Sequence, residues 1–156
     1  NIPENEINEL IKNGNEIANH NMMDWPYKKY TENDFETDLL LNKDILSSYK
    51  QEYSLWYRAP FGQLSNNMNK VLNKHNMKHV LPSVFAHDTF IPDPKWISKY
   101  ILKRVIPGSI LLIHMPEKGV REWNYEALKL TLQGLKEKKL EVLNLTEISN
   151  KEILNA

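Results

Sequence analysis

The sequence has 156 residues, about the length of one domain, and its 41% of hydrophobic residues are enough for a packed core. Twenty Lys and Arg residues balance twenty Asp and Glu residues, which argues against nucleic acid or an anionic membrane as partner, because both need a concentrated positive field. The lack of cysteine excludes disulfides and thiolate metal ligands, and no apolar run approaches the ~20 residues of a membrane-spanning helix. These features do not indicate a compartment.

The first half of the chain is predicted to alternate between helix and strand. A helix should begin at Pro3 and end before Gly14. A longer amphipathic helix is expected over 35–49, preceded by Thr31 and Asp34, either of which can cap it. The other elements expected here are a strand over 16–19, a strand over 55–57 that runs into a loop at Pro60 and Gly62, and a helix capped by Ser65.

The second half continues the alternation. The apolar run Ile110 to Ile113 is typical of a strand buried on both faces of a parallel sheet, with His114 at its carboxyl end. The other elements expected here are a strand over 80–85 that contains Pro82, a helix between Asp93-Pro94 and Pro107-Gly108, a helix over 123–138, a strand over 140–145 and a terminal helix.

This order predicts one α/β domain over residues 1–156, with a mainly parallel sheet. In such sheets and barrels, chemistry gathers at the carboxyl ends of the strands. Five predicted strands are too few to close an eight-stranded (β/α) barrel. Either the sheet is open, or part of the fold is absent from this chain.

Polar residues follow four of the predicted strands. His20 and Asp24 lie four residues apart, so on one helical turn they project to the same side and could bind one zinc or similar ion. The alternative is a surface histidine and a capping aspartate. Arg58, next to the rigid loop at Pro60, suits fixed contact with a carboxylate, and its alternative is a surface salt bridge.

The other two strand ends carry His87-Asp88 and His114. Asp88 could simply form an Asx turn, and His114 could be a half-buried core residue. The joint observation is stronger, because a purely structural domain has no reason to place a His, Asp or Arg at four successive strand ends. We therefore expect His20, Asp24, Arg58, Asp88 and His114 to converge on one face of the sheet.

These residues resemble the polysaccharide deacetylases with the NodB-homology fold, a distorted (β/α) barrel. The segment from Gly14 to His20 resembles the stretch leading to that family's first metal histidine, and Arg58 to Gly62 resembles its Arg-x-Pro-aromatic-Gly motif. The run from Pro107 to His114 is similar to its Pro-Gly-Ser-hydrophobic-His segment, and 140–148 to its closing strand and helix. The resemblance covers nearly the whole chain.

Two departures from the family pattern matter. The second metal histidine of the family falls on Asp24, which can still ligate a metal. The opening pair of aspartates, a catalytic base and a metal ligand, has no counterpart in the sequence. We therefore expect a barrel that is incomplete at its N-terminus, with an exposed sheet edge that a helix, a partner or a second copy could cover.

The resemblance implies hydrolysis of N-acetyl groups on polymers that contain N-acetylglucosamine, of the chitin or peptidoglycan type. His20 and Asp24 would hold a divalent metal, zinc by preference, and His114 would protonate the departing amine with Asp88 orienting it. Arg58 would hold the catalytic aspartate. Because two ligands make an incomplete site, we expect weak or absent metal binding in this chain alone.

An alternative function is a catalytically inactive carbohydrate-binding relic of the same fold. Under either function, aromatic rings would contact the sugar; the candidates are Trp25, Phe61, Phe90 and Trp123. A different metal-dependent hydrolase on a similar barrel is less favoured, because it does not account for the Arg58 to Gly62 loop.

Overall fold

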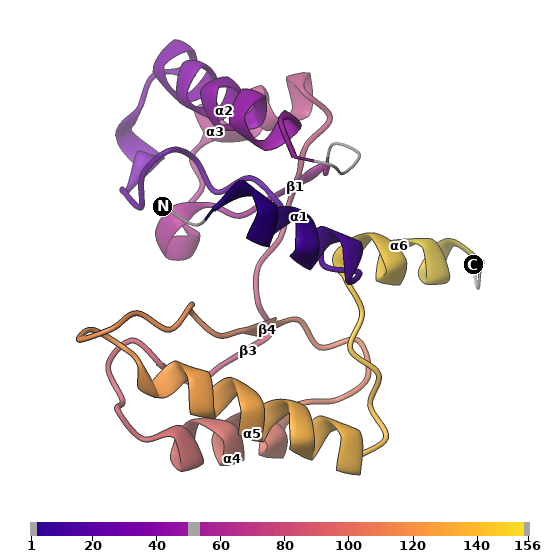
Figure 1. Cartoon of the computed structure of the whole chain (residues 1–156). Coiled ribbons are helices and arrows are strands. Elements are labelled where there is room, and N and C mark those ends of the chain that lie inside the picture. The colour runs from indigo at the N-terminus through magenta and orange to yellow at the C-terminus, as the bar shows by residue number, and fades with distance from the viewer. Residues whose placement is uncertain (1–2, 50–53, 155–156) are drawn as a thin grey trace. The chain divides into compact units, whose positions relative to one another are not determined.

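The computed structural model describes residues 3–49 and 54–154, which form mixed helix and strand (Figure 1). In chain order the elements are α1 (Glu4–Lys12), the 3-10 helix η1 (Tyr27–Lys29), α2 (Glu32–Ser47), β1 (Trp56–Tyr57), the 3-10 helix η2 (Pro60–Gly62), α3 (Asn66–Lys74), β2 (Lys78–His79), β3 (Val84–Phe85), α4 (Pro94–Arg104), β4 (Leu111–Leu112), α5 (Trp123–Glu137) and α6 (Leu145–Leu154). No helix in this part of the chain is both long and apolar enough to cross a membrane.

The chain divides into two compact units. Unit 1 comprises Asn1–Leu81 with Asn144–Ala156, and unit 2 comprises Pro82–Leu143. Each unit contains one parallel pair of strands: β1 with β2 in unit 1, and β3 with β4 in unit 2. The expected parallel pairing is therefore confirmed within each unit, whereas a single domain over 1–156 and a barrel stay predictions.

The helix starts follow the capping residues that the sequence contains. The side chains of Thr31, Ser65 and Asp93 accept hydrogen bonds from the backbone N–H three residues further on, at the starts of α2, α3 and α4. Gly14, after α1, has a φ of +87°, a left-handed conformation that glycine adopts without strain. These boundaries confirm the predicted helices.

Unit 1 has its core between α2, α3 and the strand pair. Phe35 and Leu39 of α2 are fully buried against Tyr57 of β1 and Met68 of α3. The predicted strand over 16–19 is reduced here to one parallel bridge between Asn19 and Tyr57. This bridge places the residue after Asn19 at the carboxyl end of β1.

Unit 2 packs α4 and α5 together beside β3 and β4 (Figure 1). Its buried core contains Ile97 and Ile101 of α4 and Ala127 of α5. β4 is half-buried, not buried on both faces as predicted, because Leu111 and Ile113 pack on this core while Leu112 alternates to the other face.

Of two further strand predictions, the one over 80–85 is confirmed only at β3 (Val84–Phe85), and the one over 140–145 is wrong. The strand expected over 80–85 is divided, since the N–H of Val80 donates to Tyr57 in unit 1 and that of Ser83 to Ile110 in unit 2. Pro82 lies between them and has no N–H to continue a ladder. Residues 140–144 form no strand, because Asn144 and Glu147 cap each other reciprocally and start α6 at the next residue.

Candidate active site

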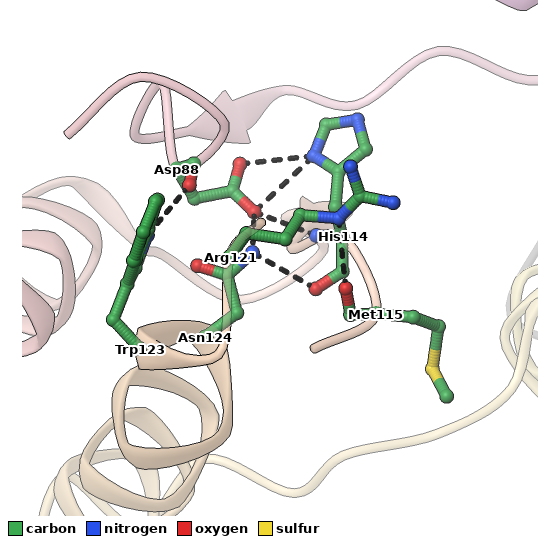
Figure 2. Close-up of polar contacts among 6 residues, drawn as sticks. All are labelled: Asp88, His114, Met115, Arg121, Trp123 and Asn124. Carbon is green, nitrogen blue, oxygen red and sulfur yellow. Dashed lines mark hydrogen bonds and ion pairs between the residues drawn. The ribbon is translucent and has the colours of Figure 1, made fainter. Parts of the chain in front are cut away.

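The carboxyl ends of β3 and β4 bring Asp88 and His114 into direct contact (Figure 2). Nδ1 of His114 lies 3.1 Å from Oδ1 and 3.2 Å from Oδ2 of Asp88, and the backbone N–H of His114 donates to Oδ2 at 2.7 Å. A carboxylate can only accept, so Nδ1 carries the proton of the neutral ring. This contact leaves Nε2 of His114 as the nitrogen that can take up or release a proton.

The two partners differ in exposure. Asp88 is 1% exposed, whereas the side chain of His114 is 42% exposed. Burial acts to raise the pKa of Asp88, but hydrogen bonds and the charge interaction with His114 outweigh it and hold the pKa below its ordinary value. Asp88 is therefore a fixed carboxylate beneath an imidazole that solvent or substrate can reach.

Two residues of α5 complete this cluster. The side-chain amide of Asn124, fully buried, donates to Oδ2 of Asp88 at 2.8 Å and to the carbonyl of His114 at 3.0 Å. The indole N–H of Trp123 donates to the Asp88 carbonyl at 2.9 Å. Asn124 was not identified from the sequence. The feature that could have identified it is its position three residues before the buried Ala127, which places a polar amide on the inner face of α5.

Trp123 is only partly exposed and packs against the core of unit 2. Through its hydrogen bond and its packing, Trp123 supports the backbone of Asp88. A role of Trp123 in sugar binding stays a prediction. Below His114, the backbone is held by Arg121, whose Nε donates to the Met115 carbonyl at 2.9 Å. Figure 2 shows the side chains of His114 and Asn124 grouped around the carboxylate of Asp88.

In unit 1, His20 and Arg58 lie at the carboxyl end of β1. Asn19 donates its N–H to Trp56 at 3.1 Å and accepts from the N–H of Arg58 at 3.0 Å. The ring of His20 then donates through Nδ1 to the Arg58 carbonyl at 2.6 Å. This bond orients the imidazole so that Nε2 is free to act as an acceptor or ligand.

Nε2 of His20 faces Asp24, and the distance from this nitrogen to Oδ1 of Asp24 is 4.0 Å. An Nδ1–H tied to a carbonyl is the usual arrangement of a metal-ligating histidine. Both side chains are exposed, by 49% and 77%, and zinc sites use three or four protein ligands. No group of three His, Cys, Asp or Glu residues positioned for a metal exists within residues 3–49 and 54–154. The pair thus fits a metal site in part.

A partly buried polar network shapes the loop between His20 and Asp24. Oδ1 of Asp38, on α2, accepts from the Asn21 amide at 2.6 Å and from the N–H of Met22 at 3.0 Å. Its Oδ2 accepts from the Tyr27 hydroxyl at 2.8 Å, and Tyr57 donates to Asn21 at 2.5 Å. Asn21 has a φ of +64°, so this network holds a left-handed residue next to His20.

Asp38 had not been identified from the sequence. It lies one residue before buried Leu39 and three after buried Phe35, on the inner face of α2. An acidic residue on an otherwise apolar helix face is the sequence feature that could have identified it as a structural hydrogen-bond acceptor. Burial, then the hydrogen bond to Asp38, raise the pKa of Tyr27 well above its ordinary value, so this hydroxyl stays a donor.

The side chain of Arg58 has a buried Nε without a hydrogen-bond partner among the described residues, and the same holds for Nε2 of His79 on β2. Burial lowers the pKa of both groups, and the positive charge of Arg58 lowers that of His79 further. A buried guanidinium with an unused donor is suited to receive a carboxylate.

Three of the four predicted aromatic platforms are exposed: Trp25 by 52%, Phe61 by 64% and Phe90 by 83%. Phe61 also has a φ of +57° in the loop after Arg58.

Of the five polar residues expected to converge, the structure brings Asp88 together with His114, and His20 together with Asp24 and the backbone of Arg58. Convergence of all five on one face stays a prediction.

Comparison with known proteins identifies the family. The polysaccharide deacetylase family model matches residues 1–80, just over half of the chain and the part that contains His20, Asp24 and Arg58. The chain belongs to the polysaccharide deacetylase family.

Among individual relatives, the peptidoglycan-N-acetylglucosamine deacetylase of Bacillus cereus is 24% identical over 134 residues, which cover 86% of this chain and 49% of the relative. The chain thus spans about half the length of the curated deacetylase it matches.

Two solved structures show the fold of this member of the polysaccharide deacetylase family. The family 4 carbohydrate esterase domain of a multidomain xylanase from the hindgut metagenome of Trinervitermes trinervoides matches with a TM-score of 0.85 and 15% identity, over 96% of this chain and 70% of that one. A family 4 pseudoenzyme from Bacillus anthracis matches with a TM-score of 0.79 and 21% identity, over 92% and 50%. The architecture is therefore the α/β fold of these proteins.

Proposed function

We propose that this chain carries part of the catalytic centre of a deacetylase that hydrolyses N-acetyl groups on N-acetylglucosamine polymers. The observation that carries the proposal is the contact between Asp88 and His114, at the carboxyl ends of two parallel strands. A buried carboxylate that orients a half-exposed imidazole is the arrangement required for general acid and base catalysis. The peptidoglycan N-acetylglucosamine deacetylase among its relatives supports this substrate class.

In this proposal, His114 donates the proton from Nε2 to the amine that leaves when the C–N bond of the acetamide breaks. Asp88 holds Nδ1–H and stabilises the imidazolium before that transfer, while Asn124 keeps Asp88 in place. The attacking group is a water molecule, which adds to the acetyl carbonyl and gives its proton to the catalytic aspartate, so that acetate and the free amine are the products. A backbone N–H near Phe61 donates to the oxyanion that forms on the carbonyl.

His20 and Asp24 are the residues that would hold a divalent metal, with zinc preferred for this pair of ligands. Once bound, the metal would supply a Lewis acid and lower the pKa of a bound water. Arg58 would bind a catalytic aspartate through its unpartnered Nε. The sequence contains no pair of adjacent aspartates, so we propose that an aspartate-bearing first strand completes the centre.

The test compares the 156-residue chain with the same chain preceded by an aspartate-bearing first strand. Acetate release from acetylated glucosamine oligomers and metal content by mass spectrometry are measured for both. We expect weak or no metal in the chain alone and metal with activity in the extended protein. Full metal occupancy in the chain alone would show that its ligands are miscounted.

In the extended protein, His114→Ala should lower turnover by roughly 10²–10⁴-fold without lowering metal occupancy, because His114 is assigned to proton transfer. His87→Asn is the matched control: His87 lies next to Asp88, is exposed and has a φ of +50°, which asparagine tolerates. Loss of metal in His114→Ala, or equal loss of turnover in His87→Asn, would contradict the assignment.

A second candidate function is glycan binding without catalysis. Two observations favour it. His20 and Asp24 supply only two of the ligands that a metal site needs, and the rings of Phe61 and Phe90 are exposed. The same measurements separate the two functions. A binding protein would retain chitin or peptidoglycan oligomers while the extended chain bound no metal and released no acetate.

A further inference from the structure

The outer face of α4 concentrates positive charge in a chain whose net charge is zero. Within its 11 residues, α4 contains Lys95, Lys99, Lys103 and Arg104 and no acidic residue. The three lysines are spaced by four, so they form one stripe along the helix. In the part of the chain that the structure describes, none of the three forms an ion pair.

This lysine stripe borders a hollow between α4 and α5, with a volume of about 630 Å³. From α5, Gln133, Gly134 and Glu137 face the hollow, and Glu137 is the only acid among its lining residues. Gly134 has no Cβ, which lets the side chain of Leu102 from α4 pack closely against α5. The lining also contains Leu102 and Leu130, so the hollow offers ammonium and amide donors to a ligand beside an apolar surface.

A second stripe of α4 carries rings. Trp96 and Tyr100 are stacked, with centroids 4.9 Å apart and planes 29° apart, and the guanidinium of Arg104 lies 3.5 Å from the Tyr100 centroid. Trp96 is 39% exposed. Each ring follows a lysine by one residue, or 100° around the helix, so the two stripes are neighbours on the outer face.

We propose that this surface, made of the lysine stripe, Trp96 and the hollow, binds a polysaccharide that carries carboxylates. The ammonium groups would neutralise the carboxylates, and the exposed ring of Trp96 would stack on the apolar C–H face of a sugar. A neutral glycan would leave the lysines unused, and a polyphosphate without sugar rings would leave Trp96 unused. None of these residues belongs to the cluster of Asp88 and His114.

The proposal rests on the proposed function in taking a glycan as the ligand, but its test measures binding alone. The probe is polygalacturonate, whose sugar rings each carry a carboxylate, and the readout is retardation of the chain by affinity electrophoresis in gels that contain it. Chitin oligomers and inorganic polyphosphate are the comparison ligands. Circular dichroism checks that each variant is folded.

The triple variant Lys95→Gln, Lys99→Gln, Lys103→Gln should weaken polygalacturonate binding roughly tenfold, since three exposed ion pairs are lost. The control changes three exposed lysines elsewhere, Lys12→Gln, Lys118→Gln and Lys138→Gln, and should change it less than about twofold. Glu137→Gln removes the opposing charge and should strengthen binding.

Trp96→Ala should weaken the binding of polygalacturonate and leave that of polyphosphate unchanged. No retardation by polygalacturonate, equal weakening by the control triple, or equal binding of neutral chitin oligomers would overturn the proposal. Equal loss of polyphosphate binding in Trp96→Ala would also overturn it. If the extended protein released no acetate while polygalacturonate binding was intact, the deacetylase function would be refuted and the proposed binding surface would not.

Discussion

Replacing Asp88 by alanine tests the structural basis of the candidate site most directly. The carboxylate is 1% exposed and accepts the backbone N–H of His114, the ring of His114 and the amide of Asn124. Alanine would leave these donors without their acceptor in a place that little water can reach. We therefore expect a loss of stability and not only a loss of activity.

The magnitude follows from the three contacts. Hydrogen bonds to a charged group contribute about 1.5–3 kcal/mol each, and the ring of His114, 42% exposed, can regain water, so its share is small. The two remaining bonds predict a cost of roughly 3–6 kcal/mol for Asp88→Ala. Asp88→Asn keeps one acceptor oxygen and should cost about 2 kcal/mol. Either is a large part of a typical ~5–15 kcal/mol stability.

The effect should also depend on pH. Because the pKa of Asp88 is lowered in the folded state, its contribution is complete above the ordinary aspartate pKa of about 3.9 and is lost as pH falls through the lowered value. The difference between the native chain and Asp88→Asn should therefore be largest at neutral pH and shrink in acid.

Urea unfolding followed by circular dichroism, at neutral pH and in acid, measures both effects. Asp44→Asn is the control, since it removes the same charge from an exposed position of α2. A cost for Asp88→Ala no larger than that for Asp44→Asn, or a difference between the native chain and Asp88→Asn that does not shrink in acid, would refute the reasoning.

Three further changes have expected outcomes. Asp38→Asn should cost about 1–3 kcal/mol in urea unfolding and shift the NMR resonances of the His20 ring; unchanged resonances would contradict the loop-holding role. Glu36→Gln should lower the thermal unfolding temperature at neutral pH but not in acid, because hydrogen bonds from Lys74 and then His75 lower the pKa of Glu36 and their benefit is lost as pH falls through that value. Gly134→Ala places a Cβ 2.2 Å from Cδ1 of Leu102, so overpacking of ~1–3 kcal/mol should outweigh a helix gain of ~1 kcal/mol; a higher urea midpoint would show that Leu102 moves freely.

The helices could be predicted because their signals are local. Thr31, Ser65 and Asp93 each bond to an N–H three residues away, so the sequence neighbourhood contains both partners. The residues at strand ends could be identified for the same reason: His114 directly follows a short apolar run, and Asp88 follows another after one intervening residue, His87. Which of them meet follows from parallel pairing, since carboxyl ends of parallel neighbours lie at one edge.

The tertiary structure decided what depends on distant partners. Leu140 to Leu143 are apolar enough for a strand, but a strand needs a neighbour's N–H and C=O groups, and the capping pair of Asn144 and Glu147 offers a local alternative. Asp38 and Asn124 read locally as ordinary polar residues in helices. Their roles arise because folding places the partly buried Asp38 and the fully buried Asn124 beside donors and acceptors 10 to 36 residues away, where an unpaired polar group would be costly.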